Sequence, residues 1–129
     1  MILAIDPGLQ KCGLAVMDAQ SRVLEKKVVE RVQLESYVVG LVAKYRMDTI
    51  VIGGGTAAKS VQRELSRIDL YCNIVFTDEK FSTLEARRKY WREHPLHGLL
   101  RFIPTSLLPP PGPIDDYAAV VLGERYLKG

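Results

Sequence analysis

The sequence contains little from which to build a disulfide framework, a zinc site or a membrane anchor. Its two cysteines, Cys12 and Cys72, lie far apart without a CxxC pair, so we expect two reduced thiols, although one long-range disulfide also fits the pattern. His94 and His97 have no third ligand beside them, which argues against zinc. No apolar stretch approaches the ~20 residues that cross a bilayer, and no leader precedes the strand that begins at the N-terminus. We therefore expect a soluble, cytoplasmic protein.

The charges are nearly balanced. Lysine and arginine number 18 against 15 acidic residues, which gives a net charge of +3. That sign permits a polyanionic partner without demanding one. With 129 residues, of which 47% are hydrophobic, the chain has room for one domain, 1–129, with an ordinary core.

Three strands are predicted in the first thirty residues. Residues 2–6 form a short apolar run that ends at Pro7 and Gly8, and residues 13–18 and 22–30 have the same character. The third of these contains Lys26 and Lys27, which suit an edge strand because lysine discourages pairing with other chains. Short polar turns between the three predict an antiparallel meander.

From residue 34 onwards the apolar spacing becomes helical. We expect a helix over 34–45, a strand over 49–52 that ends in three glycines, a second helix around Val61, Leu65 and Ile68, and a strand over 74–76. Ser82 and Glu85 have capping-box spacing, which predicts a third helix over 82–93.

Residues 94–113 show no periodicity and hold six of the seven prolines, so we expect a long loop, which is usually mobile or functional. A last helix follows, and its apolar face is predicted to comprise Ile114, Tyr117, Ala118, Val121 and Leu122. Single strands that alternate with helices imply right-handed parallel crossovers. The expected fold is α/β: a five-stranded mixed sheet, in which an antiparallel meander precedes the parallel strands, with helices on both faces and the first strand central.

Asp6 ends that central strand, and the glycines of its Asp-x-Gly-x-x-x-x-Gly pattern are Gly8 and Gly13. The glycines allow a tight turn and a close approach of the backbone to a ligand. The carboxylate would lie beyond the carboxyl end of the strand, where open sheets bind ligands. An ordinary Asp-Pro-Gly turn is the alternative interpretation of the same residues.

Two further acidic pairs, Asp78-Glu79 and Asp115-Asp116, follow a strand and open a helix. Glu79 follows the fifth strand, and if that strand is parallel to the first, Glu79 reaches the edge where Asp6 lies; alone, it would be read as a solvated loop residue. Asp115 and Asp116 open the last helix, where helix capping is an equally ordinary role. Neighbouring helical residues point about 100° apart, so only one of the two can serve the site; we take Asp115, which lies three residues before Ala118 of the apolar face.

Asp6, Glu79 and Asp115 together suggest a metal site. Carboxylates ~4 Å apart repel by roughly 4 kcal/mol per pair at an effective dielectric constant of 20, so three of them need a cation. Oxygen ligands without His or Cys favour Mg²⁺ or Mn²⁺. Two such ions are a known means of phosphodiester hydrolysis.

The residues also resemble a known family. Residues 5–8 (Ile-Asp-Pro-Gly) with 13–16 (Gly-Leu-Ala-Val), then 78–86 (Asp-Glu-Lys-Phe-Ser-Thr-Leu-Glu-Ala), then 115–119 (Asp-Asp-Tyr-Ala-Ala) resemble the three motifs of the YqgF family. This family belongs to the RuvC-like branch of the RNase H-like superfamily, and its members are described as Holliday junction resolvases and pre-16S rRNA processing nucleases. The resemblance implies an RNase H-like fold, an acidic triad of Asp6, Glu79 and Asp115, and a nucleic-acid substrate: branched DNA or precursor rRNA.

Two departures from the family pattern are visible. Lys80 stands where the family commonly has arginine, which keeps the charge and loses a bidentate donor. RuvC resolvases carry a glutamate after the fourth strand, where this chain has Gly53-Gly54-Gly55. The segment from Gly53 to Thr56 instead resembles the YqgF-type domain of Tex-family transcription accessory proteins, some of which are thought not to cut.

Basic residues are expected to contact the nucleic-acid backbone. Four of them fall on the third helix beside Tyr90 and Trp91, which suits phosphate contacts with aromatic stacking; a solvated helix face with Trp91 turned to the core is the alternative. The residues assigned to nucleic-acid binding are Lys59, Lys80, Arg87, Arg88 and Arg92.

Two other functions remain open at this point. One is a nucleic-acid-binding module that keeps the fold without the chemistry. The other is an actin-like ATPase lobe, whose phosphate turn has the same Asp-x-Gly-x-x-x-x-Gly pattern, although 129 residues supply at most one of the two lobes that such enzymes close. For the assembly we expect a monomer or a homodimer.

Overall fold

The computed structural model describes residues 1–77, 83–94 and 115–128, and for 83–87 it describes only the helical backbone. The predictions for Glu79, Lys80 and the proline-rich loop therefore lie outside the described residues. None of the helices in these ranges is long and apolar enough to cross a membrane.

A five-stranded mixed sheet forms the centre of the molecule. Its order is β3-β2-β1-β4-β5. β1 (Ile2–Asp6), β2 (Lys11–Met17) and β3 (Val23–Glu30) form the antiparallel meander, while β4 (Thr49–Ile52) and β5 (Asn73–Phe76) extend the sheet in parallel with β1. The predicted sheet and the central place of β1 are confirmed, and β3 is an edge strand, as its lysines indicated.

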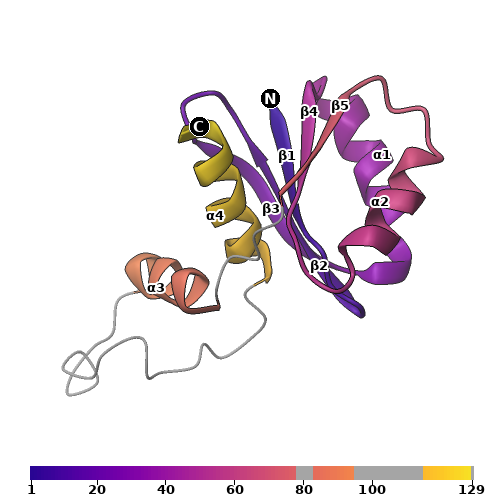
Figure 1. Ribbon diagram of the computed structural model, residues 1–129. Helices are drawn as coiled ribbons and strands as arrows, with labels where there is room; N and C mark the ends of the chain where they lie inside the picture. The colour runs from indigo at the N-terminus through magenta and orange to yellow at the C-terminus, as the bar shows by residue number, and fades with distance from the viewer. Residues whose placement is uncertain (78–82, 95–114, 129) are drawn as a thin grey trace, which may run out of the picture.

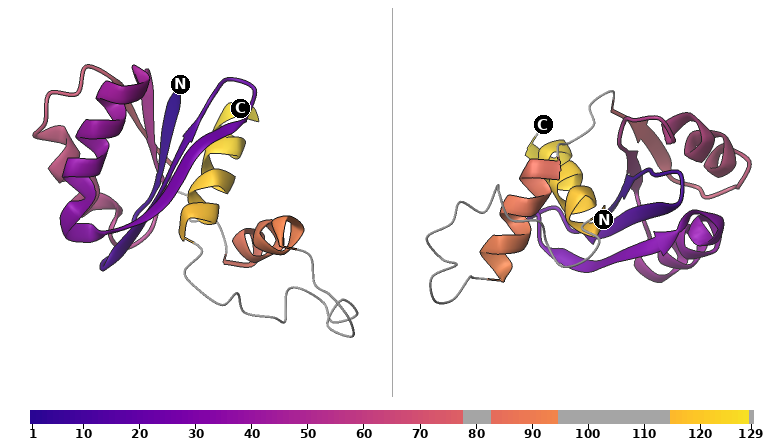
Figure 2. Two further views of the ribbon diagram at one scale, coloured as in Figure 1. Left: turned by 180° about the vertical axis from the view of Figure 1, so that it is seen from behind. Right: turned by 90° about the horizontal axis from the view of Figure 1, so that it is seen from below.

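Helices cover both faces of this sheet (Figure 1). A short 3₁₀ helix, η1 (Arg31–Gln33), leads into α1 (Leu34–Tyr45), which lies with α2 (Ala58–Ser66) on one face. On the other face lies α4 (Asp115–Lys128), and α3 (Thr83–Glu93) packs against the outer side of α4 (Figure 2). The expected helices on both faces are confirmed.

Alternation along β1 divides the core in two. Leu3 and Ile5 are fully buried beneath α1 and α2, while Ala4 packs with Ala119 of α4 on the opposite face. Both faces of β1 are covered because successive side chains of a strand point to opposite sides. The strand residues under α4 include Ala4 and Ala15. The helix lies close to the strands, since a Cβ added to Gly123 would come within 2.4 Å of the Met17 sulfur.

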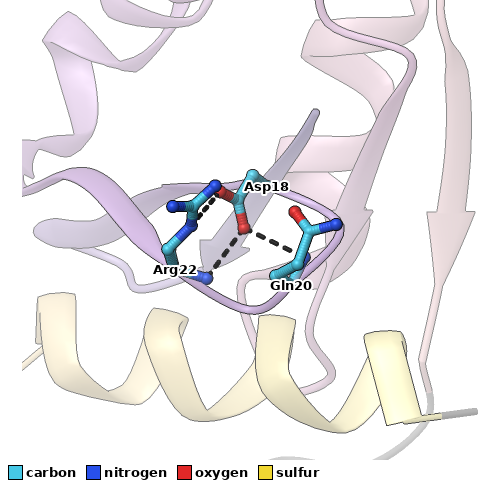
Figure 3. Close-up of polar contacts among 3 residues, drawn as sticks. All are labelled: Asp18, Gln20 and Arg22. Atoms are coloured by element: carbon cyan, nitrogen blue, oxygen red, sulfur yellow. Dashed lines mark hydrogen bonds and ion pairs between the residues drawn. The ribbon is translucent and has the colours of Figure 1, made fainter.

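The turn between β2 and β3 is held by Asp18 (Figure 3). Asp18 Oδ1 accepts hydrogen bonds from the backbone N–H groups of Gln20 (3.0 Å) and Arg22 (2.9 Å), and Oδ2 accepts one from Arg22 Nε (2.7 Å). Ser21 takes the left-handed φ of 64° that this turn requires. The turn aligns β3 with β2, so that Lys26 stands opposite Ala15 and Lys27 opposite Leu14.

Three local predictions were wrong. α2 ends at Ser66, so Ile68 lies beyond it and packs against the core from the loop before β5. β2 begins at Lys11 and ends at Met17, earlier than expected at both ends. On α4, Ala118 is only half-buried whereas Ala119 and Val120 are fully buried, because the sheet and α3 each cover a side of the helix and widen its buried arc.

Candidate functional site

The carboxyl ends of β1, β4 and β5 meet at one edge of the sheet. Gly53 N–H donates to the Ile5 carbonyl (3.0 Å) and Thr77 N–H donates to the Ile52 carbonyl (3.0 Å), so the three parallel strands end almost level. Asp6 is the last residue of β1 and is half-buried. The structure therefore places Asp6 where the sequence predicted it, at the central strand's carboxyl end.

Gly13 brings the start of α4 to the same point. It stands opposite Asp6 in the pairing of β1 with β2. A Cβ added to Gly13 would lie 1.8 Å from the Asp115 carbonyl oxygen and 2.9 Å from the Asp116 nitrogen. The backbone of α4 thus rests directly on β2 at a residue without a side chain, and this contact delivers half-buried Asp115 to the edge that carries Asp6.

Gly8 serves the turn that follows Asp6. A Cβ added there would come within 2.1 Å of the Lys11 carbonyl oxygen, so the backbone can fold back on itself only with glycine at this position. The Cys12 thiol faces the same turn, 3.7 Å from the Gly8 carbonyl oxygen. At both glycines of the predicted pattern, Gly8 and Gly13, a side chain would therefore clash with neighbouring backbone atoms.

The Cys12 thiol is buried close to both acids, Asp6 and Asp115. Burial raises the pKa of its thiol; the Gly8 carbonyl and the charge of Arg31 lower it, and the negative charges of Asp6 and Asp115 raise it further. Both carboxylates are therefore near enough to act on one buried sulfur. Cys12 is fully buried and Cys12 and Cys72 are both free, which confirms the expectation of two thiols and places Cys12 in the packing, not at the surface.

The third predicted acid, Glu79, falls in the segment 78–82 that lies outside the described residues, as does Lys80. β5 ends at Phe76, at the same edge as Asp6. In the described ranges, 1–77, 83–94 and 115–128, no group of three His, Cys, Asp or Glu side chains is close enough to hold a metal ion. Two of the three acids of the predicted triad, Asp6 and Asp115, thus lie at one edge, and the position of Glu79 stays a prediction.

Asp116 has a different environment from Asp115. Its Oδ2 lies 3.3 Å from the Lys26 amino group, and its Oδ1 accepts a hydrogen bond from the Tyr117 N–H (2.9 Å). The same amino group lies 4.2 Å from the centre of the Tyr117 ring. Burial lowers the pKa of Lys26, but the charge and hydrogen bond of Asp116, with Tyr117, outweigh it and raise the net pKa. Asp116 therefore ties the start of α4 to the edge strand.

Among the residues predicted to bind nucleic acid, those that the structure describes lie on opposite faces of the sheet. Thr56 and Lys59 are exposed at the start of α2, which follows the carboxyl end of β4. Arg88 and Arg92 are exposed on α3, on the opposite face of the sheet; Arg87 also falls on α3, but its side chain is not described. The structure thus separates Lys59 from the α3 arginines by the thickness of the sheet.

The aromatic residues of α3, Tyr90 and Trp91, are half-buried and contact neighbouring rings. Tyr90 stacks on His94, with 4.3 Å between ring centres, and meets Tyr117 of α4 edge-on at 5.5 Å. Trp91 is half-buried and contacts Tyr90 edge-on at 4.9 Å. The Tyr90 ring therefore joins α3 to α4.

Sequence reasoning missed three basic residues near these elements. Lys26 was interpreted only as an edge-strand residue, although its amino group contacts Asp116 at the start of α4. Arg125 and Lys128 were passed over, yet both line a groove between α4 and α3 together with Arg88 and Arg92. Arg125 and Lys128 are three residues apart and so share one helix face, and this spacing could have indicated a basic surface from the sequence.

The chain is similar to known proteins over nearly its whole length. The family model of the Tex protein YqgF-like domain matches residues 1–82, which include Asp6 and Glu79 and stop before α3. A Sulfurimonas denitrificans protein named "Putative pre-16S rRNA nuclease" is 29% identical over 133 residues, which cover 98% of this chain and 95% of that protein.

Two solved structures have the same fold. Thermus thermophilus RuvC in complex with a Holliday junction substrate superposes with a TM-score of 0.56 at 15% identity, covering 94% of this chain and 88% of that one. A second structure of Thermus thermophilus RuvC gives a TM-score of 0.54 at 13% identity with the same coverage. At these identities the likeness concerns the fold, and it confirms the predicted RNase H-like arrangement.

Proposed function

Because this chain belongs to the family of the Tex protein YqgF-like domain, we propose that it is a divalent-metal-dependent nuclease that hydrolyses phosphodiester bonds in branched DNA or structured RNA. The observation that carries the proposal is the contact of Asp115 with Gly13 opposite Asp6, which gathers two acids at the edge reached by β5. The relative named for pre-16S rRNA cleavage spans nearly the whole chain and supports the same activity.

The residues present fit Mg²⁺ or Mn²⁺. Asp6 and Asp115 are half-buried carboxylates from a strand and a helix that pack rigidly together, and Glu79 would complete the set. The donors are all oxygens, and the Cys12 thiol beside them has its pKa raised by burial, which disfavours the thiolate that zinc prefers. When bound, such an ion activates the attacking water and neutralises charge on the phosphate.

The protein's own residues supply orientation in this proposal. β1 holds Asp6 by strand pairing on both sides, and the packing of α4 on Gly13 sets the position of Asp115. The Lys26–Asp116 contact restrains the first turn of α4, so that Asp115 keeps one direction. Fixed carboxylates are needed because a misplacement of about 1 Å costs roughly a hundredfold in rate.

The test is cleavage by the purified protein with Mg²⁺, Mn²⁺ or EDTA on four substrates: a four-way DNA junction, a DNA duplex, a duplex RNA and a precursor 16S rRNA fragment. We expect Asp6→Asn to abolish metal-dependent cleavage and to leave folding almost unchanged, because it keeps the volume and removes one charge. Asp69→Asn is the control, since Asp69 is exposed between α2 and β5, away from this edge.

Two outcomes would contradict the proposal. Wild-type cleavage by Asp6→Asn would remove the acidic edge from the chemistry. Tight binding of these substrates by the wild type without any cleavage would instead favour the non-catalytic nucleic-acid-binding module.

We further propose that residues 1–129 work as one domain in the cytoplasm, where the free thiols of Cys12 and Cys72 would stay reduced. Sedimentation of the purified chain distinguishes the monomer from the homodimer. The choice between junction DNA and precursor rRNA is made by the substrate panel.

A further inference from the structure

A basic groove runs between α3 and α4. It encloses about 470 Å³ and is lined by Arg88 and Arg92 from α3 and by Val121, Glu124, Arg125 and Lys128 from α4. The α4 residues recur at intervals of three and four, so they share one helix face. That face is turned away from the sheet, which α4 meets through Ala119, Val120, Leu122 and Leu127.

The groove concentrates positive charge. Its one acidic residue, Glu124, is paired with Lys89 at 3.1 Å, so its charge is already balanced, while Arg88, Arg92, Arg125 and Lys128 are exposed. Without these five cations and Glu124, the rest of the chain has 13 basic and 14 acidic side chains. The groove and its neighbour Lys89 thus carry five positive charges against one negative charge.

The two walls are rigidly joined. Besides the Lys89–Glu124 ion pair, the Tyr90 and Tyr117 rings meet at 5.5 Å. Burial and the nearby Glu93 carboxylate of α3 raise the pKa of the Tyr117 hydroxyl, which places an additional polar contact between the helices. The cations of the groove thus keep fixed relative positions instead of moving on separate elements.

We propose that this groove binds the phosphodiester backbone of a nucleic acid at a distance from the acidic edge. The proposal rests on the proposed function, because it treats Asp115 at the other end of α4 as the place of cleavage. Three of the four exposed cations are arginines, whose planar guanidinium groups match phosphate oxygens in pairs. A backbone with a charge at every nucleotide is the partner that such a row of cations fits.

The length of α4 determines how far the groove lies from Asp115. A helix rises about 1.5 Å per residue, so the groove begins about 9 Å beyond Asp115, at Val121, and ends about 20 Å beyond it, at Lys128. One strand of a duplex advances about 3.4 Å per nucleotide. The groove would therefore contact phosphates roughly three to six nucleotides from the bond that is cut.

The test is the binding of labelled duplex DNA and duplex RNA in EDTA, which prevents cleavage, at a series of salt concentrations. We expect Arg125→Gln with Lys128→Gln to weaken binding at least about tenfold and to reduce the salt slope by about two units on DNA, at about 0.9 per phosphate contact. Arg46→Gln with Arg67→Gln is the matched control, since it removes two exposed charges from the ends of α1 and α2. Circular dichroism verifies the folding of both double variants.

The results separate the groove from the nuclease activity. An unchanged salt slope in the groove variant, or an equal loss in the control, would overturn the groove and leave wild-type cleavage as independent support for the nuclease. If the groove variant alone loses binding while the wild type cleaves nothing in Mg²⁺ or Mn²⁺, the groove stands and the proposed nuclease fails.

Discussion

At the scale of single residues, the two aspartates at the start of α4 have distinct surroundings. Asp116 is held by Lys26 and by the Tyr117 N–H, whereas Asp115 begins the helix at the backbone contact with Gly13. Adjacent helical side chains point about 100° apart, so one acid is directed to the strand β3 and the other away from it. This division supports the assignment of Asp115 to the proposed metal site.

Replacing each aspartate by asparagine should distinguish their roles. Asp115→Asn should reduce metal-dependent cleavage by orders of magnitude without lowering the melting temperature. Asp116→Asn should retain most of the cleavage and lower the free energy of unfolding by about 0.5–1 kcal/mol, because it removes a partly exposed ion pair and a charge at the helix start. One cleavage assay and one thermal melt decide the matter; an inactive Asp116→Asn beside an active Asp115→Asn would reverse the assignment.

Gly13 offers a second residue-scale prediction. In Gly13→Ala the new methyl group would overlap the Asp115 carbonyl, which is backbone and cannot rotate away, so α4 must shift. We expect a loss of about 1–3 kcal/mol of stability, the usual cost of overpacking, together with a loss of cleavage.

The control for that variant is Gly40→Ala. Gly40 lies in the exposed middle of α1 with nothing within 4 Å of an added Cβ, so the same substitution there should stabilise the protein by about 0.5–1 kcal/mol through helix propensity. Equal effects at the two positions in denaturant unfolding would show that the Gly13 contact is not tight.

At the scale of elements, the hairpin of β2 and β3 joins both faces of the molecule. Its two lysines point to opposite sides: Lys27 donates a hydrogen bond to the Tyr37 hydroxyl of α1 (2.9 Å), and Lys26 meets Asp116 of α4 (3.3 Å). The edge strand therefore touches a helix in each layer, and its lysines also discourage pairing with strands of other chains. Its alignment depends on the Asp18 turn.

The Asp18 turn predicts a dependence of stability on pH. The hydrogen bond from the Arg22 N–H is the largest cause of the lowered Asp18 pKa; burial opposes it, and the Arg22 side chain and the Gln20 N–H lower the pKa further. Since the folded pKa lies below the ordinary value of 3.8, the stabilisation is complete well above pH 3.8 and is lost as the pH falls through the folded value.

Asp18→Asn should therefore lower the melting temperature at neutral pH, and the difference from the wild type should shrink as the pH falls below about 4. Melts across this range test it, with Asp69→Asn as an exposed acid whose effect should be small. A difference that grows on acidification would contradict the sign of the Asp18 contribution.

At the scale of the whole molecule, we expect the acidic edge, formed by Asp6 and Asp115, to be destabilised by charge repulsion when no cation is bound. Asp6 and Asp115 come from segments at opposite ends of the chain, and their charges act on one buried thiol. Bringing carboxylates together costs free energy because their charges repel, and a bound cation offsets that cost. The stability of the fold should therefore depend on the ion that the site is proposed to bind.

We expect Mg²⁺ or Mn²⁺ at ten times its Kd to stabilise the protein by about 1.4 kcal/mol, which raises the Tm by roughly 5 °C in a domain of this size. Asp6→Asn with Asp115→Asn should melt higher than the wild type in EDTA and should gain little from the cation. A differential scanning melt in EDTA, Mg²⁺ and Mn²⁺ provides the measurement. An equal gain in the double variant would place the cation elsewhere.

The sequence by itself determined the elements and their order. Apolar alternation and helical spacing are local patterns, so α1 and β4 were predicted at their exact bounds and the parallel crossovers followed from strand and helix order alone. The position of Asp6 followed as well, because the last residue of a central strand must lie at its carboxyl end. Gly8 and Gly13 could be singled out, although not for the contacts that they make.

Only the tertiary structure decided which side chains meet across long stretches of chain. Lys26 and Asp116 are ninety residues apart, and no local pattern reports a contact of that kind. The basic groove exists because α3 packs on α4 through Lys89 and Glu124, which brings Arg88 and Arg92 beside Arg125 and Lys128. Likewise, the need for glycine at position 13 arises from the backbone of Asp115 resting on it, since the steric requirement comes from a helix at the far end of the chain.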